Sequence, residues 1–214
     1  MTQIPFDDEA WKQLPALLDH LPNPVRIHLW ADKDGTVDEN HALNLVSLLS
    51  DNFSTVEFQL FPRRSNYSFY PVFGVMGVEE ERPIDYGIRI IGLPIGYQMT
   101  SLITAIQSAA FKGMTSEALS RIQLAKLEKD IALELITDGE DEMGPVMAQI
   151  IFNFAVISPF IKSYLIMGNS FQDAYVRYSI NYLPHVVINE RYHVEGAATE
   201  GELLEDIAKC LKGA

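Results

Sequence analysis

The sequence predicts an α/β protein made of two tandem copies of one pattern, each a mixed four-stranded sheet flanked by helices. Two observations lead to this prediction. Residues 25–60 can be laid over residues 131–166 without a gap, at a constant offset of 106. Both windows run from a strand-like segment through a polar loop and a helical segment to a second strand. Identity between the windows is low, so the copies share a pattern and not residues.

In the first copy the strand VRIHLWAD ends at Asp32, and the helical run DENHALNLVSLLSDNF precedes the strand TVEFQLF. A hairpin follows, with arms YPVFGVMGV and YGIRIIG, a turn at EEERPID, and Pro71 at its opening. A helix at about Met99–Lys112 closes the copy. Gly113 comes just after it, where a glycine cap is common.

In the second copy the strand IALELITD ends at Asp138, and it is followed by the helical run GPVMAQIIFNFAVISP and the strand IKSYLIM. An extra helical segment at Phe171–Asn181, which the first copy lacks, precedes the hairpin HVVINE–RYHVEG. Leu183-Pro184 opens this hairpin, and a helix at about Thr199–Lys212 closes the copy before Gly213.

Two more helices are expected outside the repeat. One covers Asp7–His20, because aspartates suit a first turn and Pro22 suits a stop. The other, Ser116–Asp130, joins the copies and is amphipathic; its predicted inner face carries Leu119, Ile122 and Leu127. The predicted domains are therefore residues 1–113, a linking helix over 114–130, and residues 131–214.

The charge balance disfavours two classes of partner. The formal charge is −13, from 29 acidic and 16 basic side chains, and a nucleic-acid or anionic membrane surface needs a basic footprint. The longest apolar stretch, near Val146–Ile161, is too short and too interrupted to span a bilayer. The N-terminus has neither the basic nor the apolar region of a signal peptide, so we expect a cytoplasmic protein.

The helical segment IIFNFAVI is apolar nearly all round, which indicates burial on two sides. One side would pack on its own sheet. The other would pack on the first copy, on a partner chain such as that of a homodimer, or on a bound peptide.

The element order, with a proline opening each hairpin, resembles the thioredoxin fold. The tandem form resembles the N-terminal domain of flavin-dependent alkyl hydroperoxide reductase and the glutaredoxin-like protein disulfide oxidoreductases. The resemblance covers about residues 8–213. Its most specific stretch is Pro94-Ile-Gly-Tyr-Gln-Met-Thr-Ser-Leu102, where the family typically has Pro-x-Gly-His-Glu-Phe-x-Ser-Leu. The run Leu183–Asn189 resembles the family's proline loop and the strand that follows it. The resemblance implies a cis peptide bond before Pro184, and by the repeat also before Pro71.

The resemblance places the family's Cys-x-x-Cys-Pro on Asp141-Glu142-Met143-Gly144-Pro145, with Asp141 at the attacking position and Gly144 at the resolving one. The first copy has Gly35–Glu39 there, also without cysteine, and the family's acidic partner becomes Gln98. Disulfide exchange needs one thiolate to attack and a second thiol to resolve. The chain has one cysteine, so dithiol chemistry is excluded.

The single cysteine is Cys210, in the closing helix. The inner face of that helix is marked by Leu203, Leu204, Ile207 and Leu211. Cys210 lies three residues from Ile207, so we predict a partly buried structural thiol, with a reactive thiol as the alternative.

No metal or cofactor is predicted. The acids Asp138, Glu140, Asp141 and Glu142 suit a helix cap, with a hard-cation site as the alternative. The five histidines are structural or surface residues in our interpretation: His20, His28, His41, His185 and His193. Only His185, just after Pro184, is expected to face the former active site. Gly92–Gly96 is interpreted as a turn that joins the copies, or as an anion cradle. Phosphate-loop, dinucleotide and serine-hydrolase motifs do not occur.

Three functional hypotheses follow. The first is a redox-inactive adaptor, scaffold or chaperone-like factor that binds a protein partner at the proline loop, Leu183–His185. The second is a component of a disulfide- or peroxide-reducing system that acts through Cys210 or through a partner's thiols. The third is a small-molecule or metal site in a cleft formed by Asp141, Gln98 and His185.

Overall fold

The computed structural model describes residues 8–213. The first copy contains α1 (Asp8–Leu18), β1 (Val25–Trp30), α2 (Val37–Asn52), β2 (Val56–Phe61), β3 (Val72–Glu79), β4 (Arg82–Ile91) and α3 (Gln98–Ala110). The second contains β5 (Ile131–Thr137), α5 (Gly144–Ile157), β6 (Ile161–Met167), α6 (Asp173–Tyr178), β7 (His185–Ile188), β8 (Tyr192–Glu195) and α7 (Glu200–Lys212). Between them lies α4 (Ala118–Leu124). The predicted element order is confirmed in both copies.

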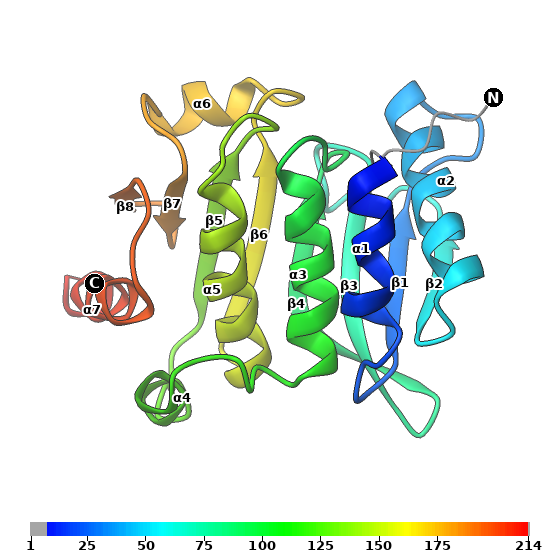
Figure 1. The fold of residues 1–214 in the computed structure, drawn as a ribbon. Helices are drawn as coiled ribbons and strands as arrows, with labels where there is room; N and C mark the ends of the chain where they lie inside the picture. The colour runs from blue at the N-terminus through cyan, green and yellow to red at the C-terminus, as the bar shows by residue number, and fades with distance from the viewer. Residues whose placement is uncertain (1–7, 214) are drawn as a thin grey trace.

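The strands form one eight-stranded sheet in the order β2-β1-β3-β4-β6-β5-β7-β8 (Figure 1). Within each half, two parallel strands are joined by an antiparallel hairpin, as the sequence predicts. The halves meet where β4 and β6 pair in parallel, with Ile88–Ile91 opposite Ser163–Ile166. The sequence analysis did not foresee that the two sheets would fuse at this pair.

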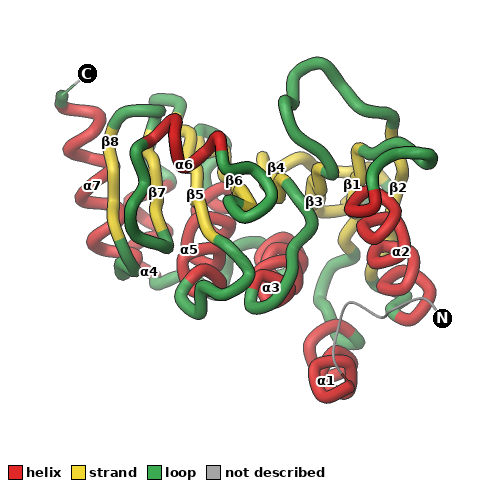
Figure 2. Tube along the Cα trace, turned by 90° about the horizontal axis from the view of Figure 1, so that it is seen from above, coloured by secondary structure: helices red, strands yellow, loops and turns green. Residues whose placement is uncertain are grey.

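One face of the sheet carries most of the helices (Figures 1 and 2). Side chains of α2, α3, α5 and α7 form a single apolar cluster with the strands. Helix α5 packs against its own strands on one side and against α3 of the first copy on the other. This arrangement explains its apolar surface, so the chain does not require the homodimer that we considered as a cover for this helix.

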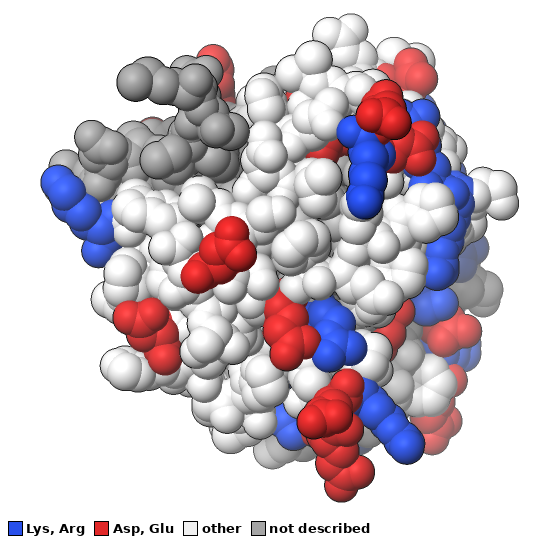
Figure 3. Space-filling model, turned by 90° about the vertical axis from the view of Figure 1, so that its right-hand side faces the viewer, with Lys and Arg blue, Asp and Glu red and all other residues white. Residues whose placement is uncertain are grey.

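The opposite face is covered differently in the two copies. In the second copy α6 packs over Ile136 and Val187. In the first copy the loop at residues 62–71 takes that place, and its tyrosines pack over Trp30. The arginines Arg63 and Arg64 of this loop lie over aromatic rings, and Lys and Arg gather along the right-hand edge of Figure 3. The molecule is therefore not uniformly negative, although its net charge is −13.

The inner face predicted for the linking helix is wrong. Leu119 and Ile122 are 64% and 55% exposed, whereas Ser120 and Leu124 are buried. Helix α4 has only 7 residues and contacts α5 and α7, so tertiary contacts and not an apolar stripe decide which face is covered. Leu127, also predicted there, is partly buried and lies beyond the end of α4.

The turn predicted for the first hairpin is too long. The strands are joined by Glu80 and Glu81 alone, and both have a positive φ, as a two-residue hairpin turn requires. Pro83 lies inside β4, at a point where β4 does not pair with β6. A proline is tolerated there because no ladder hydrogen bond to that neighbour is lost.

The first helix begins at Asp8 and ends at Leu18; Asp7, predicted in its first turn, lies outside the described residues. None of the helices within residues 8–213 is long and apolar enough to cross a membrane.

Candidate functional site

The residues that the resemblance maps onto the thiol motif lie at the N-terminal end of α5, at the top of Figure 1. The loop Asp138–Met143 leads from β5 into this helix, and Pro145 stands in its first turn. Proline suits that position because its missing N–H has no partner there in any case.

The side chain of Asp141 is held inside the loop. One carboxylate oxygen accepts the Thr137 hydroxyl at 2.7 Å, and the other accepts the Met143 N–H at 3.0 Å. Asp138 likewise accepts the Glu140 N–H at 2.9 Å. These acids cap the turn before the helix, and not the helix itself, whose N-cap residue Met143 makes no side-chain cap. Within residues 8–213 no three His, Cys, Asp or Glu side chains converge as metal ligands.

Gln98 connects the two copies. It is fully buried at the start of α3, and its amide N–H groups donate to the carbonyls of Asp138 and Asp141, each at 2.9 Å. Its amide oxygen accepts the Ser101 hydroxyl at 2.7 Å. Both amide hydrogens are used, so Gln98 acts as a brace between α3 and the loop before α5.

Gly144 has no space for a side chain. A Cβ atom at this position would lie 2.4 Å from the Gln98 amide nitrogen and 2.4 Å from the Thr137 hydroxyl oxygen. The position that the resemblance assigns to a resolving thiol is thus filled by polar groups of its neighbours. We call Gln98, Thr137, Asp141 and Gly144 together the Asp141 network.

The turn at Gly92–Gly96 packs directly on this loop. Gly96 has φ +55, and a Cβ there would lie 2.1 Å from the Gly139 carbonyl oxygen. Tyr97 donates its N–H to that same carbonyl at 3.0 Å and its hydroxyl to Glu142 at 2.7 Å. These contacts support the interpretation of this segment as a joining turn.

The proline loop lies beside the network. His185 pairs with Ile136, so the preceding Pro184 lies next to Thr137. The peptide bonds before Pro71 and Pro184 are both cis, as the resemblance implies.

His185 does not face this site, contrary to our expectation. Its Nε2 lies 2.8 Å from Nδ1 of His193, and the His193 ring packs on Tyr178 of α6. His185 alternates with Val186, which belongs to the core on the other face of the sheet. Burial lowers the pKa of His185 and favours its neutral form. The structure therefore does not form the cleft of Asp141, Gln98 and His185.

The corresponding site in the first copy is closed by an ion pair that the sequence analysis missed. Glu39 is fully buried near the start of α2, where Arg63 binds its carboxylate. The N–H groups of Asp32 and Thr36 donate to it at 3.0 and 2.7 Å. Hydrogen bonding by Arg63 is the largest cause that lowers the pKa of Glu39 to about 2. The spacing Thr36-x-x-Glu39 of a capping box was the available signal.

Cys210 is buried, with its Sγ 3.8 Å from the carbonyl oxygen of Ile188. Leu203, Leu204 and Ile207 are buried with it, as predicted. Ile188 is three residues along β7 from His185, so the carbonyl that Cys210 contacts lies roughly 10 Å from the proline loop.

Apolar side chains remain exposed around the Asp141 network. Tyr97 is 47%, Met143 43%, Val146 45% and Tyr182 67% exposed. Ile95, at 41%, contacts Gly139 from the joining turn. We call these five residues the apolar rim. Four of them lie on the joining turn, the loop before α5 and the first turn of α5, and Tyr182 lies two residues before Pro184. The centre of the site is closed by hydrogen bonds.

No family model matches the sequence. Among curated proteins, an alkyl hydroperoxide reductase subunit of Xanthomonas campestris pv. phaseoli is 29% identical over 199 residues, which is 91% of this chain and 35% of that protein. The corresponding protein of Escherichia coli is 26% identical over 211 residues, which is 98% of this chain and 38% of that protein. The chain thus spans little more than a third of the length of these relatives.

Among solved structures, the NTD_N/C domain of alkylhydroperoxide reductase from Enterococcus faecalis aligns with a TM-score of 0.85 at 16% identity, over 94% of this chain and 99% of that one. A protein disulfide oxidoreductase from Aeropyrum pernix aligns with a TM-score of 0.84 at 18% identity, over 97% and 94%. The predicted fold of two tandem thioredoxin-like units is confirmed. The resemblance to this family is also confirmed. This chain has a single cysteine and therefore no Cys-x-x-Cys motif.

Proposed function

We propose that this chain, a tandem thioredoxin-like protein without a Cys-x-x-Cys motif, is a redox-inactive, protein-binding component of a peroxide- or disulfide-reducing system. The observation that carries this proposal is the Asp141 network. Where relatives with a thiol motif need room for two sulfur atoms, this chain has a carboxylate bound at both oxygens and a glycine without space for a Cβ.

The apolar rim supports a protein partner. Exposed tyrosine and methionine side chains are the types that protein interfaces favour at their centre. Leu183 and Pro184 precede β7, which pairs with β5 on one side and with β8 on the other, so we propose that this loop, and not the strand, contacts a partner's extended chain. A surface of this kind can hold a polypeptide without any chemistry at its centre.

The curated relatives support the kind of system. They are named as a subunit of alkyl hydroperoxide reductase, and the chain matches about a third of their length. We therefore propose that this chain acts as an adaptor or scaffold beside redox proteins and not as the reductase itself. A cytoplasmic location is part of this proposal.

A thiol reaction through Cys210 is the competing function within the same system. The burial of Cys210 speaks against it, because a thiol in apolar surroundings is a poor source of thiolate. The small-molecule or metal site of Asp141, Gln98 and His185 is not formed, because His185 lies on the other face of the sheet from the Asp141 network.

The test is affinity capture from a native extract with the purified chain and with two double variants. Tyr97→Ser/Val146→Ser removes apolar side chains of the rim. Leu119→Ser/Ile122→Ser removes two exposed apolar side chains from α4. The proposal expects a redox protein that is captured reproducibly by the wild type and the α4 variant and is lost with the rim variant. Equal capture by all three proteins, or no captured redox protein, would contradict it.

A further inference from the structure

A pocket of about 510 Å³ lies between the two copies, where two neighbouring strands part. β4 and β6 pair only from Ile88 onward, and the earlier part of β4 diverges. The divergence begins at Gly87, which has φ +83 and donates its N–H to Asp85 at 2.8 Å. Pockets that hold small ligands commonly measure about 300–1,000 Å³ and prefer such junctions between folded units.

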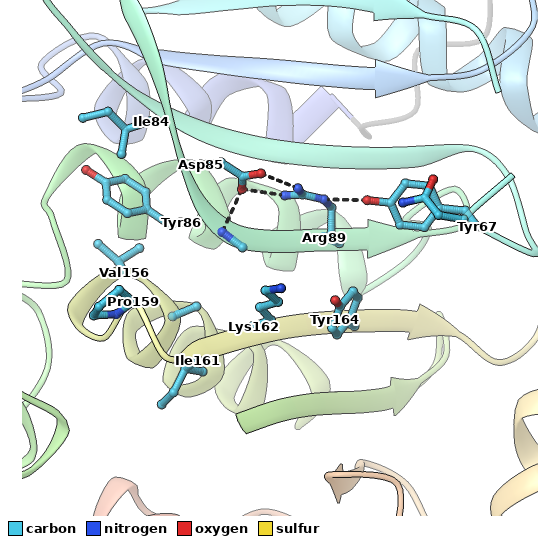
Figure 4. Close-up of a pocket in the computed structure, with 13 residues that line it drawn as sticks. Tyr67, Ile84, Asp85, Tyr86, Arg89, Val156, Pro159, Ile161, Lys162 and Tyr164 are labelled. Atoms are coloured by element: carbon cyan, nitrogen blue, oxygen red, sulfur yellow. Dashed lines mark hydrogen bonds and ion pairs between the residues drawn. The ribbon is translucent and has the colours of Figure 1, made fainter. Parts of the chain in front are cut away.

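Apolar and aromatic side chains from both copies form part of the pocket walls, beside the polar Asn66 and three charged residues (Figure 4). On the side of the first copy lie Tyr67, Ile84 and Tyr86; on the side of the second copy lie Val156, Pro159, Ile161 and Tyr164. Three tyrosine rings in one small pocket provide flat surfaces for a planar ligand. Burial raises the pKa of Tyr86 and of Tyr164, so both hydroxyls stay protonated at neutral pH and can donate hydrogen bonds.

The pocket has three charged side chains, and two of them neutralise each other. Arg89 binds both carboxylate oxygens of Asp85, at 2.9 and 2.6 Å, and its Nε donates to the Tyr67 hydroxyl at 2.8 Å. The third is Lys162, for which the described part of the chain offers no ion pair. Its stem lies against Gly87, where a Cβ would be 3.2 Å from the Lys162 Cγ. Lys162 therefore gives the pocket a net positive charge in a chain of formal charge −13.

We propose that this pocket binds a small aromatic carboxylate. The ring would lie between Tyr86 of β4 and the apolar residues at the end of α5, and the carboxylate would pair with Lys162. An aliphatic anion would leave the aromatic walls unused, and an aromatic cation would meet Lys162 without a counter-charge. The site is separate from the apolar rim and does not depend on the function proposed for it.

The test is isothermal titration of the full chain with indole-3-acetate, its neutral amide indole-3-acetamide and its cationic analogue tryptamine. The three probes share one ring and differ in charge. We expect saturable binding of indole-3-acetate and at least about tenfold weaker binding of the other two, because a charge-assisted hydrogen bond is lost. Absence of saturable indole-3-acetate binding in the millimolar range, or equal affinity for tryptamine, would overturn the proposal.

Two lysine variants locate the site. Lys162→Met keeps the apolar stem and removes the charge, and should weaken indole-3-acetate binding by at least about tenfold. Lys129→Met removes another exposed lysine, from the segment between α4 and β5, and should leave the affinity unchanged. Both side chains are exposed, so neither change should disturb the fold. The same affinity in both variants would show that the anion binds elsewhere and would refute the assignment.

Discussion

Replacement of Arg63 by methionine removes the guanidinium that binds Glu39 and keeps an apolar stem of similar length. Glu39 is fully buried, and without Arg63 its carboxylate would keep only the N–H groups of Asp32 and Thr36 and the Thr36 hydroxyl. A buried carboxylate that loses its cation is destabilising because its desolvation is no longer offset. We expect Arg63→Met to lower the free energy of unfolding.

The magnitude follows from the titration of Glu39. Arg63 is the largest cause that lowers the pKa of this carboxyl from 4.5 to about 2, and the whole shift corresponds to about 3 kcal/mol. Hydrogen bonds from Asp32 and Thr36 supply part of this shift and remain in the variant. The Arg63 side chain is 41% exposed, so solvent screens the pair, and we expect a loss of about 1–2 kcal/mol.

The pH dependence of this loss has a definite sign. The pKa of Glu39 is lowered in the folded state, so its contribution is complete above about pH 4.5 and is lost as the pH falls toward 2. The difference in stability between the wild type and Arg63→Met should therefore be largest at neutral pH and should shrink below pH 4.5.

Urea unfolding at neutral pH and near pH 3 measures both quantities. Arg26→Met is the matched control, because the carboxylate that Arg26 pairs with, Glu57, is 52% exposed and not buried, and such a pair contributes less than about 1 kcal/mol. The reasoning would be refuted if Arg63→Met cost no more than Arg26→Met, or if its cost were the same at both pH values.

Three further changes test other parts of the structure. Gly144→Ala should lower the free energy of unfolding by about 1–3 kcal/mol in urea, because its methyl group meets Thr137, and added Thr137→Ala should restore part of the loss; no loss would contradict the packing. Glu80→Asn with Glu81→Gly should stabilise the fold by about 1 kcal/mol and raise the melting temperature, since both positions have a left-handed backbone conformation; a lower melting temperature would contradict this. Cys210 should react slowly with a thiol reagent until urea unfolds the chain; rapid reaction of the native protein would show it is accessible.

The sequence was sufficient to predict the element order and the four-stranded sheet of each copy. Strand and helix periods are local properties of the sequence. Because the pattern repeats at an offset of 106, the elements assigned in one copy support those assigned in the other. The fusion of the sheets was not predictable in this way. It depends on which edge strands of the two copies meet, and nothing in β4 or β6 alone encodes that pairing.

The orientations predicted for His185 and for α4 are wrong because the local polar and apolar pattern does not decide which face is covered. All four residues of β7 are buried, so the strand shows no polar alternation that would tell which face His185 occupies. Helix α4 is too short for an apolar stripe to decide its orientation.

The division into domains at residues 113 and 131 remains a prediction.

The candidate site was predictable as a set of positions but not as a network. The resemblance drew attention to Asp141, Gly144 and Gln98, and the structure brings these three residues together. That they stand where relatives carry thiols remains a prediction. The bridging role of Gln98 depends on the approach of α3 to the loop before α5. Gln98 is 40 residues from Asp138 and 43 from Asp141 in the sequence, so only the fold brings them together.

The reduction of insulin disulfides by dithiothreitol, followed with and without the purified chain, shows whether this protein carries out thiol chemistry. We expect the same rate with and without the protein, because the chain has one cysteine and that thiol is buried. A rate that rises with protein concentration, and that falls back in the Cys210→Ser variant, would contradict it and would show that the chain carries out thiol chemistry.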